Sequence, residues 1–175
     1  AEFRLSSAMD QFKGEKRTAA VLTLTGLIQE QNRWEDSLKV LAGDDDAQSS
    51  TLGQMFLRTA RVGLNQMLPS EFLETMALMR HVVSEHPENV RAALCAVELA
   101  VLIYSQAYDD ALLPELMAIV RVAEDINWPM EERAAVALAK LQLQFNAGMT
   151  RQERQVAAQQ LEEIVEQSNA RHIPS

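Results

Sequence analysis

The stretch TARVGLNQMLPSEFLETMALMRHVVSEHPEN, residues 59–89, decides the fold. Apolar residues recur every three or four positions on both sides of a short break at LPSE, without the strict alternation of a strand. The break holds the proline and the small polar residue that end one helix and begin the next. The stretch therefore predicts two helices joined by a tight turn.

The rest of the chain continues this pattern. Breaks of similar composition fall at Gly14 and at AGDDDAQSS, EHPEN, NWPMEE and NAGMTRQE, which divides the chain into about nine helices. The connections are short, so consecutive helices should pack antiparallel as hairpins. The longest break, residues 43–50, is expected to be a solvated loop, and the helix at about residues 90–104 is apolar nearly all round and belongs in the middle of the array.

Capping residues support several of these boundaries. Thr150 with Glu153 fits a capping box, in which each residue accepts a hydrogen bond from the backbone N–H of the other, and Ser7 with Asp10 resembles one. Pro129 suits a helix start, because the N–H that proline lacks is unpaired there in any case.

Three short echoes show a repeat. WEDSL at 34–38, FLETM at 72–76 and YDDAL at 108–112 each have an aromatic residue, an acid, a small residue and an apolar residue in the same order. We place each echo at the start of the second helix of a hairpin. There the aromatic can pack back on the preceding helix and the small residue allows close approach of a neighbour.

The echoes, with the residues between them, resemble the tetratricopeptide repeat, a helix-turn-helix unit of about 34 residues. In the stretch quoted above, Gly63 stands at the motif's glycine, Phe72 at the turn aromatic, Thr75 at the usual alanine and Pro87 at the closing proline. The first and third copies lack the proline, and Thr25 and Leu99 take their glycine positions. The resemblance implies a right-handed superhelical array of three to four antiparallel hairpins, in which Gly63 allows close packing within its own hairpin. A generic helical bundle is the alternative.

This interpretation divides the chain into four parts. A leading helix at 4–17 precedes three hairpins at 18–127, a fourth hairpin or capping helices at 128–170, and a tail at 171–175. By resemblance, the first helix of each hairpin lines a concave groove that binds a peptide or helix of another protein. The residues expected to line this groove are Gln29, Glu30, Leu64, Met67, Leu68, Ile103, Tyr104 and Gln142.

Composition limits the partners. The net charge of −9 repels phosphate backbones, so nucleic acid is not expected as a partner. Glu98 interrupts the longest apolar run, so no insertion into a membrane is predicted. Cys95, the single cysteine, is expected to be a buried hydrophobe that does not decide the compartment. The cytoplasm is favoured, with a periplasmic domain of a larger protein as the alternative.

No catalytic chemistry can be identified. His81 and His86 are five positions apart and are expected on different faces of a helix, and His172 lies in the tail. The triplet Asp44–Asp46 lacks the spacing of a calcium loop. No nucleophile elbow or nucleotide-binding loop is present in the sequence. Neither enzymatic activity nor a cofactor or metal is predicted.

Function is therefore predicted as a non-enzymatic protein-interaction module of a bacterial scaffold or chaperone kind, with homodimerisation possible. The alternative is a regulatory or auxiliary domain of a larger enzyme, transporter or membrane polymer-assembly protein, which the start AEFRLSS without methionine would suit. Glu98 is interpreted either as a groove anchor for a basic group or as a residue that pairs with an arginine such as Arg61 or reaches an exposed edge.

Overall fold

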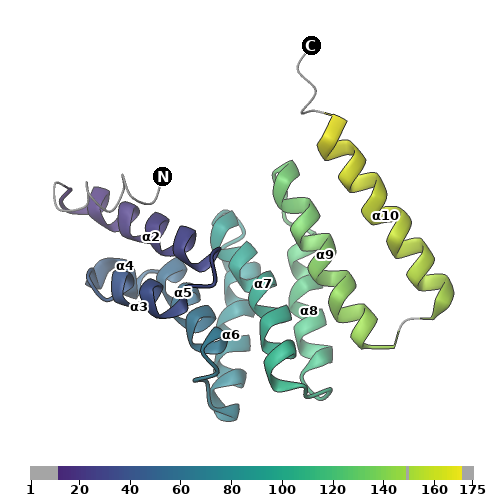
Figure 1. Ribbon diagram of the computed structural model, residues 1–175, viewed down its shortest axis with the longest axis horizontal. Helices are drawn as coiled ribbons and strands as arrows, with labels where there is room; N and C mark the ends of the chain where they lie inside the picture. Colours follow the sequence, from purple (N-terminus) through teal and green to yellow (C-terminus); the bar gives the residue numbers. More distant parts are fainter. Residues whose placement is uncertain (1–11, 149, 171–175) are drawn as a thin grey trace. The chain divides into compact units, whose positions relative to one another are not determined.

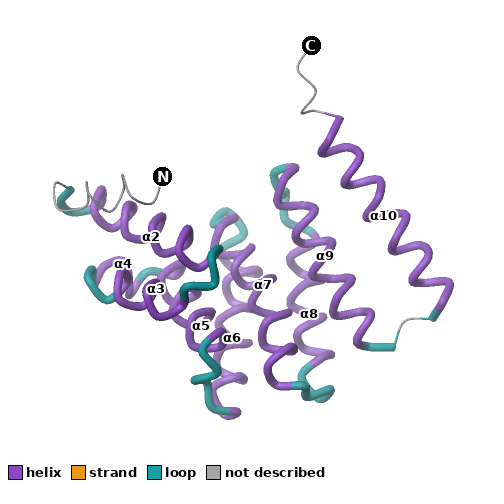
Figure 2. The backbone as a smooth tube through the Cα atoms, in the orientation of Figure 1, coloured by secondary structure: helices purple, strands orange, loops and turns teal. Residues whose placement is uncertain are grey.

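The computed structural model describes residues 12–148 and 150–170, and all of its regular structure is helical (Figures 1 and 2). The predicted all-α class is confirmed. In chain order the helices of the described residues are α2 (Glu15–Gln29), α3 (Trp34–Leu41), α4 (Asp45–Ser49), α5 (Thr51–Gly63), α6 (Pro69–Glu85), α7 (Val90–Ala107), α8 (Leu113–Glu124), α9 (Met130–Asn146) and α10 (Arg151–Ala170). Residues 15–17, assigned above to a leading helix, form the first turn of α2. Most of that leading segment, with Ser7 and Asp10, and His172 with the tail lie outside the described residues.

The chain divides into two compact units, residues 1–75 (unit 1) and 76–175 (unit 2), with the boundary inside α6. In unit 1, α5 packs against both α2 and α3. In unit 2, α9 packs against both α7 and α8, and α10 packs against α9. In each unit, the first helix of a later hairpin thus contacts both helices of the hairpin before it.

A left-handed residue follows the first helix of every hairpin. Asn32 (φ 56°) comes after α2, Asn65 (φ 54°) after α5, Tyr108 (φ 48°) after α7 and Gly148 (φ 86°) after α9. Such a residue ends a helix because its backbone turns the chain away from the helix axis. A positive φ therefore recurs in these four described connections, although the residues that adopt it differ.

The acidic stretch at 43–50 is not the solvated loop that was predicted. It contains the short helix α4, whose Ala47 is fully buried. Asp44 caps this helix: its Oδ1 accepts hydrogen bonds from the N–H of Ala47 at 2.8 Å and from Oγ1 of Thr18 at 3.2 Å, and its Oδ2 lies 3.4 Å from Nε of Arg17. The prediction failed because a capping carboxylate and a surface carboxylate look the same in sequence.

Trp34 and Gly63 bring α3 and α5 together. A Cβ atom added to Gly63 would lie 2.5 Å from Cε2 of the Trp34 indole ring. Gly63 was expected to allow close packing within its own hairpin; instead it receives the aromatic residue of the preceding hairpin. Next to this contact, the fully buried Ser37 donates a hydrogen bond from Oγ to the carbonyl oxygen of Trp34 at 2.7 Å.

The start of α6 is held by Glu71. Its Oε2 accepts a hydrogen bond from the N–H of Leu68 at 2.7 Å, and its Oε1 lies 2.8 Å from Nη2 of Arg61 on α5. The Leu68 N–H and, to a smaller extent, the Arg61 guanidinium hold the pKa of this carboxyl below its ordinary value. One carboxylate thus caps α6 and ties it to α5.

The core of unit 2 is built on α7, as its apolar sequence predicted. Seven of its residues are buried: Ala92, Ala93, Ala96, Val97, Leu99, Ala100 and Ile103. By length and composition α7 is the one described helix that could cross a membrane, although Glu98 lies within it. Because it packs against α8 and α9, burial in the core accounts for its apolar character.

The third echo does not start a helix. Tyr108 ends α7, its side chain is 82% exposed, and α8 begins only at Leu113. The first two echoes do lie in the first turn or so of a helix, with Trp34 at the start of α3 and Phe72 near the start of α6. The predicted position is therefore wrong for YDDAL.

Replacing Gly63 with alanine tests the contact with Trp34. Replacing a glycine inside a helix with alanine normally stabilises the protein by up to about 1 kcal/mol. Here the added methyl group overlaps the indole ring, so Gly63→Ala should lower the free energy of unfolding by about 1 to 3 kcal/mol. Urea denaturation followed by circular dichroism measures the change.

The control is the same change in a Trp34→Leu background, where the cost of Gly63→Ala should be smaller because the ring is absent. An equal cost in both backgrounds would refute the contact as the cause.

Candidate binding cleft

The five predicted groove residues of unit 1 do not share one environment. Gln29 is buried, and its Nε2 donates to the carbonyl oxygen of Phe56 at 2.8 Å and to Oγ of Ser37 at 3.2 Å. Met67 is 8% exposed and lies with its sulfur 3.5 Å from Oγ1 of Thr75.

The other three unit 1 residues stay accessible. Glu30 and Leu68 are exposed, and Leu64 is half-buried. Gln29 and Met67 therefore belong to the interior of unit 1, and their assignment to an exposed groove was incorrect.

The three predicted residues of unit 2 also differ. Ile103 is fully buried in the core, so it cannot line a groove. Tyr104 is half-buried and donates a hydrogen bond from its hydroxyl to Oδ1 of Asp110 at 2.7 Å, which raises the pKa of Tyr104. Gln142 is exposed on α9. Helical register did not identify which face is covered, and it placed Leu64, Met67 and Leu68 on a helix although they lie in the connection between α5 and α6.

The structure shows a different opening, beside α10. Figure 1 shows α10 running alongside α9, and among the described residues α10 packs against α9. An open cleft of about 920 Å³ lies between the three helices. All of its lining residues belong to unit 2.

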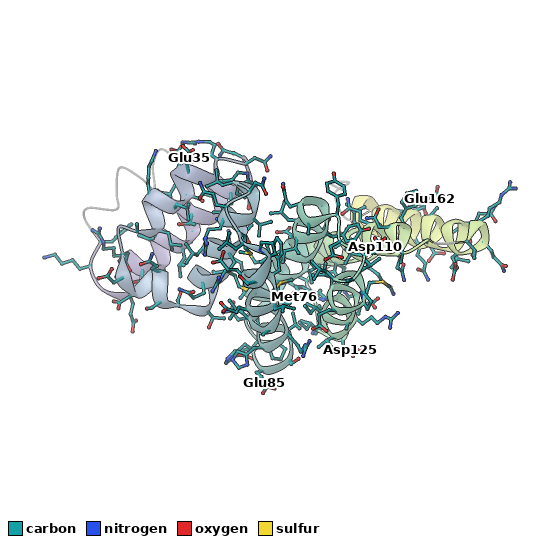
Figure 3. All side chains as sticks on the ribbon, turned by 90° about the horizontal axis from the view of Figure 1, so that it is seen from below. Glu35, Met76, Glu85, Asp110, Asp125 and Glu162 are labelled. Carbon is teal, nitrogen blue, oxygen red and sulfur yellow. The ribbon has the colours of Figure 1, made fainter. Side chains whose placement is uncertain are left out.

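The lining of the cleft mixes apolar, amide and charged side chains. From α8 come Met117, Arg121 and Glu124; from α9 come Ala137, Lys140, Leu141 and Gln144; from α10 come Gln152, Glu153, Val156, Ala157, Gln160 and Glu163; the α9–α10 connection adds Ala147, Gly148 and Thr150. Nζ of Lys140 lies 2.6 Å from Oε1 of Glu124 and joins α9 to α8. The described outer surface of α10 is polar, as at Glu162 (Figure 3).

Gly148 and Thr150 are described residues of the connection between α9 and α10. Gly148 ends α9 in the left-handed conformation that glycine adopts without steric cost. Thr150 and Glu153 then form the predicted capping box, which is confirmed. The N–H and the hydroxyl of Thr150 donate to Oε2 of Glu153 at 2.7 and 2.6 Å, and the N–H of Glu153 donates to Oγ1 of Thr150 at 3.3 Å.

The capping box changes the titration of Glu153. The hydroxyl of Thr150, followed by its backbone N–H, stabilises the carboxylate and lowers the pKa of Glu153 from its ordinary value of 4.5. Because that carboxylate also lines the cleft, the start of α10 presents a negative charge there at neutral pH.

The chemical character of the cleft lining is mixed. Its polar groups are spread over three helices, its charges have both signs, and Lys140 and Glu124 pair with one another. Within the described residues no group of three or more His, Cys, Asp or Glu side chains could hold a metal ion. The cleft offers apolar contact at Met117, Leu141 and Val156 with polar groups beside it.

Other residues singled out in the sequence have different outcomes. The rings of His81 and His86 lie edge to face, 5.1 Å apart, and not on different faces, because α6 ends at Glu85 and the chain turns back. Glu98 is exposed, which fits an exposed edge, and Arg61 pairs with Glu71. Cys95 is half-buried and not fully buried.

Comparison of the chain with models of protein families, with curated proteins and with solved structures finds no match. The cleft was missed in the sequence because no motif marks it. Thr150 and Glu153 were recognised as a capping box, but the packing of α10 against α9 depends on the fold.

The pH dependence of the α10 start tests the capping box. The lowered pKa of Glu153 means that the cap stabilises the fold above pH 4.5, and this contribution is lost as the pH falls through the lowered pKa. Thr150→Val removes the hydroxyl, so the pKa of Glu153 should rise toward its ordinary value. A ¹³C NMR titration of the carboxyl carbon measures it.

Thr150→Ser retains the hydroxyl and serves as the control, with a titration close to that of the unmodified protein. If Thr150→Val and Thr150→Ser titrate alike, the side-chain hydrogen bond is not the cause of the shift.

Proposed function

We propose that this chain is a tetratricopeptide-like array of helical hairpins that binds an α-helical segment of a partner protein in the cleft beside α10. The repeat architecture is supported by two recurring features. The first helix of a later hairpin packs against both helices of the earlier one, and a left-handed residue follows the first helix of each hairpin.

The open cleft between α8, α9 and α10 carries the functional proposal. Its volume of about 920 Å³ falls at the upper end of the range of about 300–1,000 Å³ for small-molecule pockets. Such pockets, however, usually gather a few polar groups around one ligand position, and here they are distributed along the helices. A distributed mixed lining suits the side chains of another helix.

The lining also indicates what kind of helix fits. Met117, Leu141 and Val156 can receive apolar side chains, and methionine adapts to different shapes. The amides of Gln144, Gln152 and Gln160 can donate or accept hydrogen bonds at the edges. An amphipathic helix has both kinds of side chain on one face and its border, which is the helix-in-groove mode of recognition.

A photocrosslinking residue in the cleft tests this function. Val156 lines the cleft and is 48% exposed, so p-benzoylphenylalanine in its place should be tolerated. In an extract of the native cell it should form an adduct with one reproducible protein, at a peptide from a helical segment. Mass spectrometry of the adduct identifies that segment.

Gln159 is the matched control, because it is exposed on the same helix but does not line the cleft. The same label at Gln159 should not capture the partner. A synthetic peptide of the captured segment should then bind Val156→Glu at least about tenfold more weakly, which corresponds to about 1.4 kcal/mol. Equal capture at both positions, or unchanged peptide affinity, refutes the cleft as the binding site.

A further inference from the structure

The acidic groups that line the cleft lie mainly on α10. Among the described lining residues the charged ones are Arg121 and Glu124 on α8, Lys140 on α9, and Glu153 and Glu163 on α10. The described lining residues of α10 thus include two carboxylates and no basic group. The wall that α10 forms is therefore negatively charged at neutral pH.

The opposite side of the cleft has a different balance of charge. Nζ of Lys140 lies 2.6 Å from Oε1 of Glu124, so these two charges neutralise each other. Arg121 is the remaining charged residue of that side among the described lining residues. The cleft therefore has a negative wall on α10 and a positive group on α8.

The two α10 carboxylates are accessible to a ligand, because Glu153 and Glu163 are both exposed. The capping box uses Oε2 of Glu153, so Oε1 can still accept a hydrogen bond from another molecule. The two residues are ten positions apart, which corresponds to about 15 Å along the helix axis. Val156 and Ala157 lie between them in the sequence and offer apolar contact in the same cleft.

A helix in this cleft has two borders beside its apolar face. When its apolar side chains contact Met117, Leu141 and Val156, one border faces α10 and the other faces α8. Basic side chains on the border at α10 form ion pairs with the carboxylates, whereas acidic side chains there meet like charges. Arg121 repels basic side chains at α8, so the two walls together select the rotation of the helix about its axis.

The charge of the whole chain favours the same sign of partner. The net charge of −9 attracts cationic molecules at long range and raises the rate at which they meet this protein. An acidic helix would approach against that field. The local charges of the α10 wall and the overall charge therefore act in the same direction.

We propose that the partner helix has a basic border, whose lysine or arginine side chains pair with Glu153 and Glu163 on α10. This inference rests on the proposed function, because it names the chemistry of the helix that the cleft receives. Residues about eleven positions apart share one face of a helix and lie about 16 Å apart, so a basic pair at this spacing can reach both carboxylates.

Three fluorescent model peptides of about 18 residues test the charge of this border. They share one leucine face and differ at two border positions about eleven apart, which hold lysine, glutamine or glutamate. Fluorescence anisotropy with the full chain at about 0.05 M salt should show the tightest binding for the lysine peptide and the weakest for the glutamate peptide. The difference should shrink at about 0.5 M salt, because salt screens exposed charges.

Substitutions that remove single charges from the chain locate the contact. Glu153→Gln and Glu163→Gln should each weaken binding of the lysine peptide about two- to fivefold, which is the loss typical of an exposed ion pair. Glutamine also completes a capping box, so Glu153→Gln removes the charge and keeps the start of α10. Neither substitution should weaken binding of the glutamine peptide.

Glu162→Gln is the matched control, because Glu162 is the exposed neighbour of Glu163 and is not a lining residue (Figure 3). It changes the net charge by the same amount and should leave the affinity for the lysine peptide unchanged. Equal weakening by Glu162→Gln and Glu163→Gln would assign the attraction to overall charge and overturn the proposal. Binding of the glutamate peptide as tightly as the lysine peptide would overturn it as well.

The result can be separated from that of the proposed function. Val156→Ser removes apolar contact without a change of charge, so it should weaken the lysine and glutamine peptides alike; an unchanged lysine peptide would bind elsewhere and overturn the basic border. A segment captured by the photocrosslinker at Val156 that lacks basic residues also overturns the basic border, but it leaves the cleft as the binding site. Absence of capture refutes the proposed function itself.

Discussion

The need to bury one helix against two others at once organises both units of this chain. An isolated helical hairpin cannot cover its own apolar face, so the next helix must reach both of its members. In unit 1 this requires α5 to approach α3 closely, and the absence of a side chain at Gly63 makes room for the Trp34 ring. In unit 2, small side chains serve the same purpose, because Ala92, Ala93 and Ala96 of α7 are all fully buried.

The cleft lies at the side of unit 2 where α10 packs against α9. Among the described residues α10 packs against α9, and side chains of α8 line the opening beside the two helices. Met117 and Arg121 thereby become accessible. The left-handed Gly148 follows α9 and the capping box at Thr150 begins α10, so local interactions define both helix ends beside this opening.

The sequence was sufficient for the helical class and for several helix ends, because a period of 3.6 residues and a capping side chain are local properties. Thr150 with Glu153 illustrates this success. Burial was harder to predict from the sequence. Gln29 is polar, yet it lies inside unit 1, where its amide donates hydrogen bonds to the Phe56 carbonyl oxygen and the Ser37 hydroxyl. Tyr108 fits the pattern of a helix start but ends a helix instead, since backbone conformation at a turn depends on the elements that it joins.

α9 carries a core face and a cleft face of different chemistry. Its core face holds Val136, Ala139 and Leu143. Its cleft face includes Lys140, paired with Glu124, so a ligand there meets charges that salt screens.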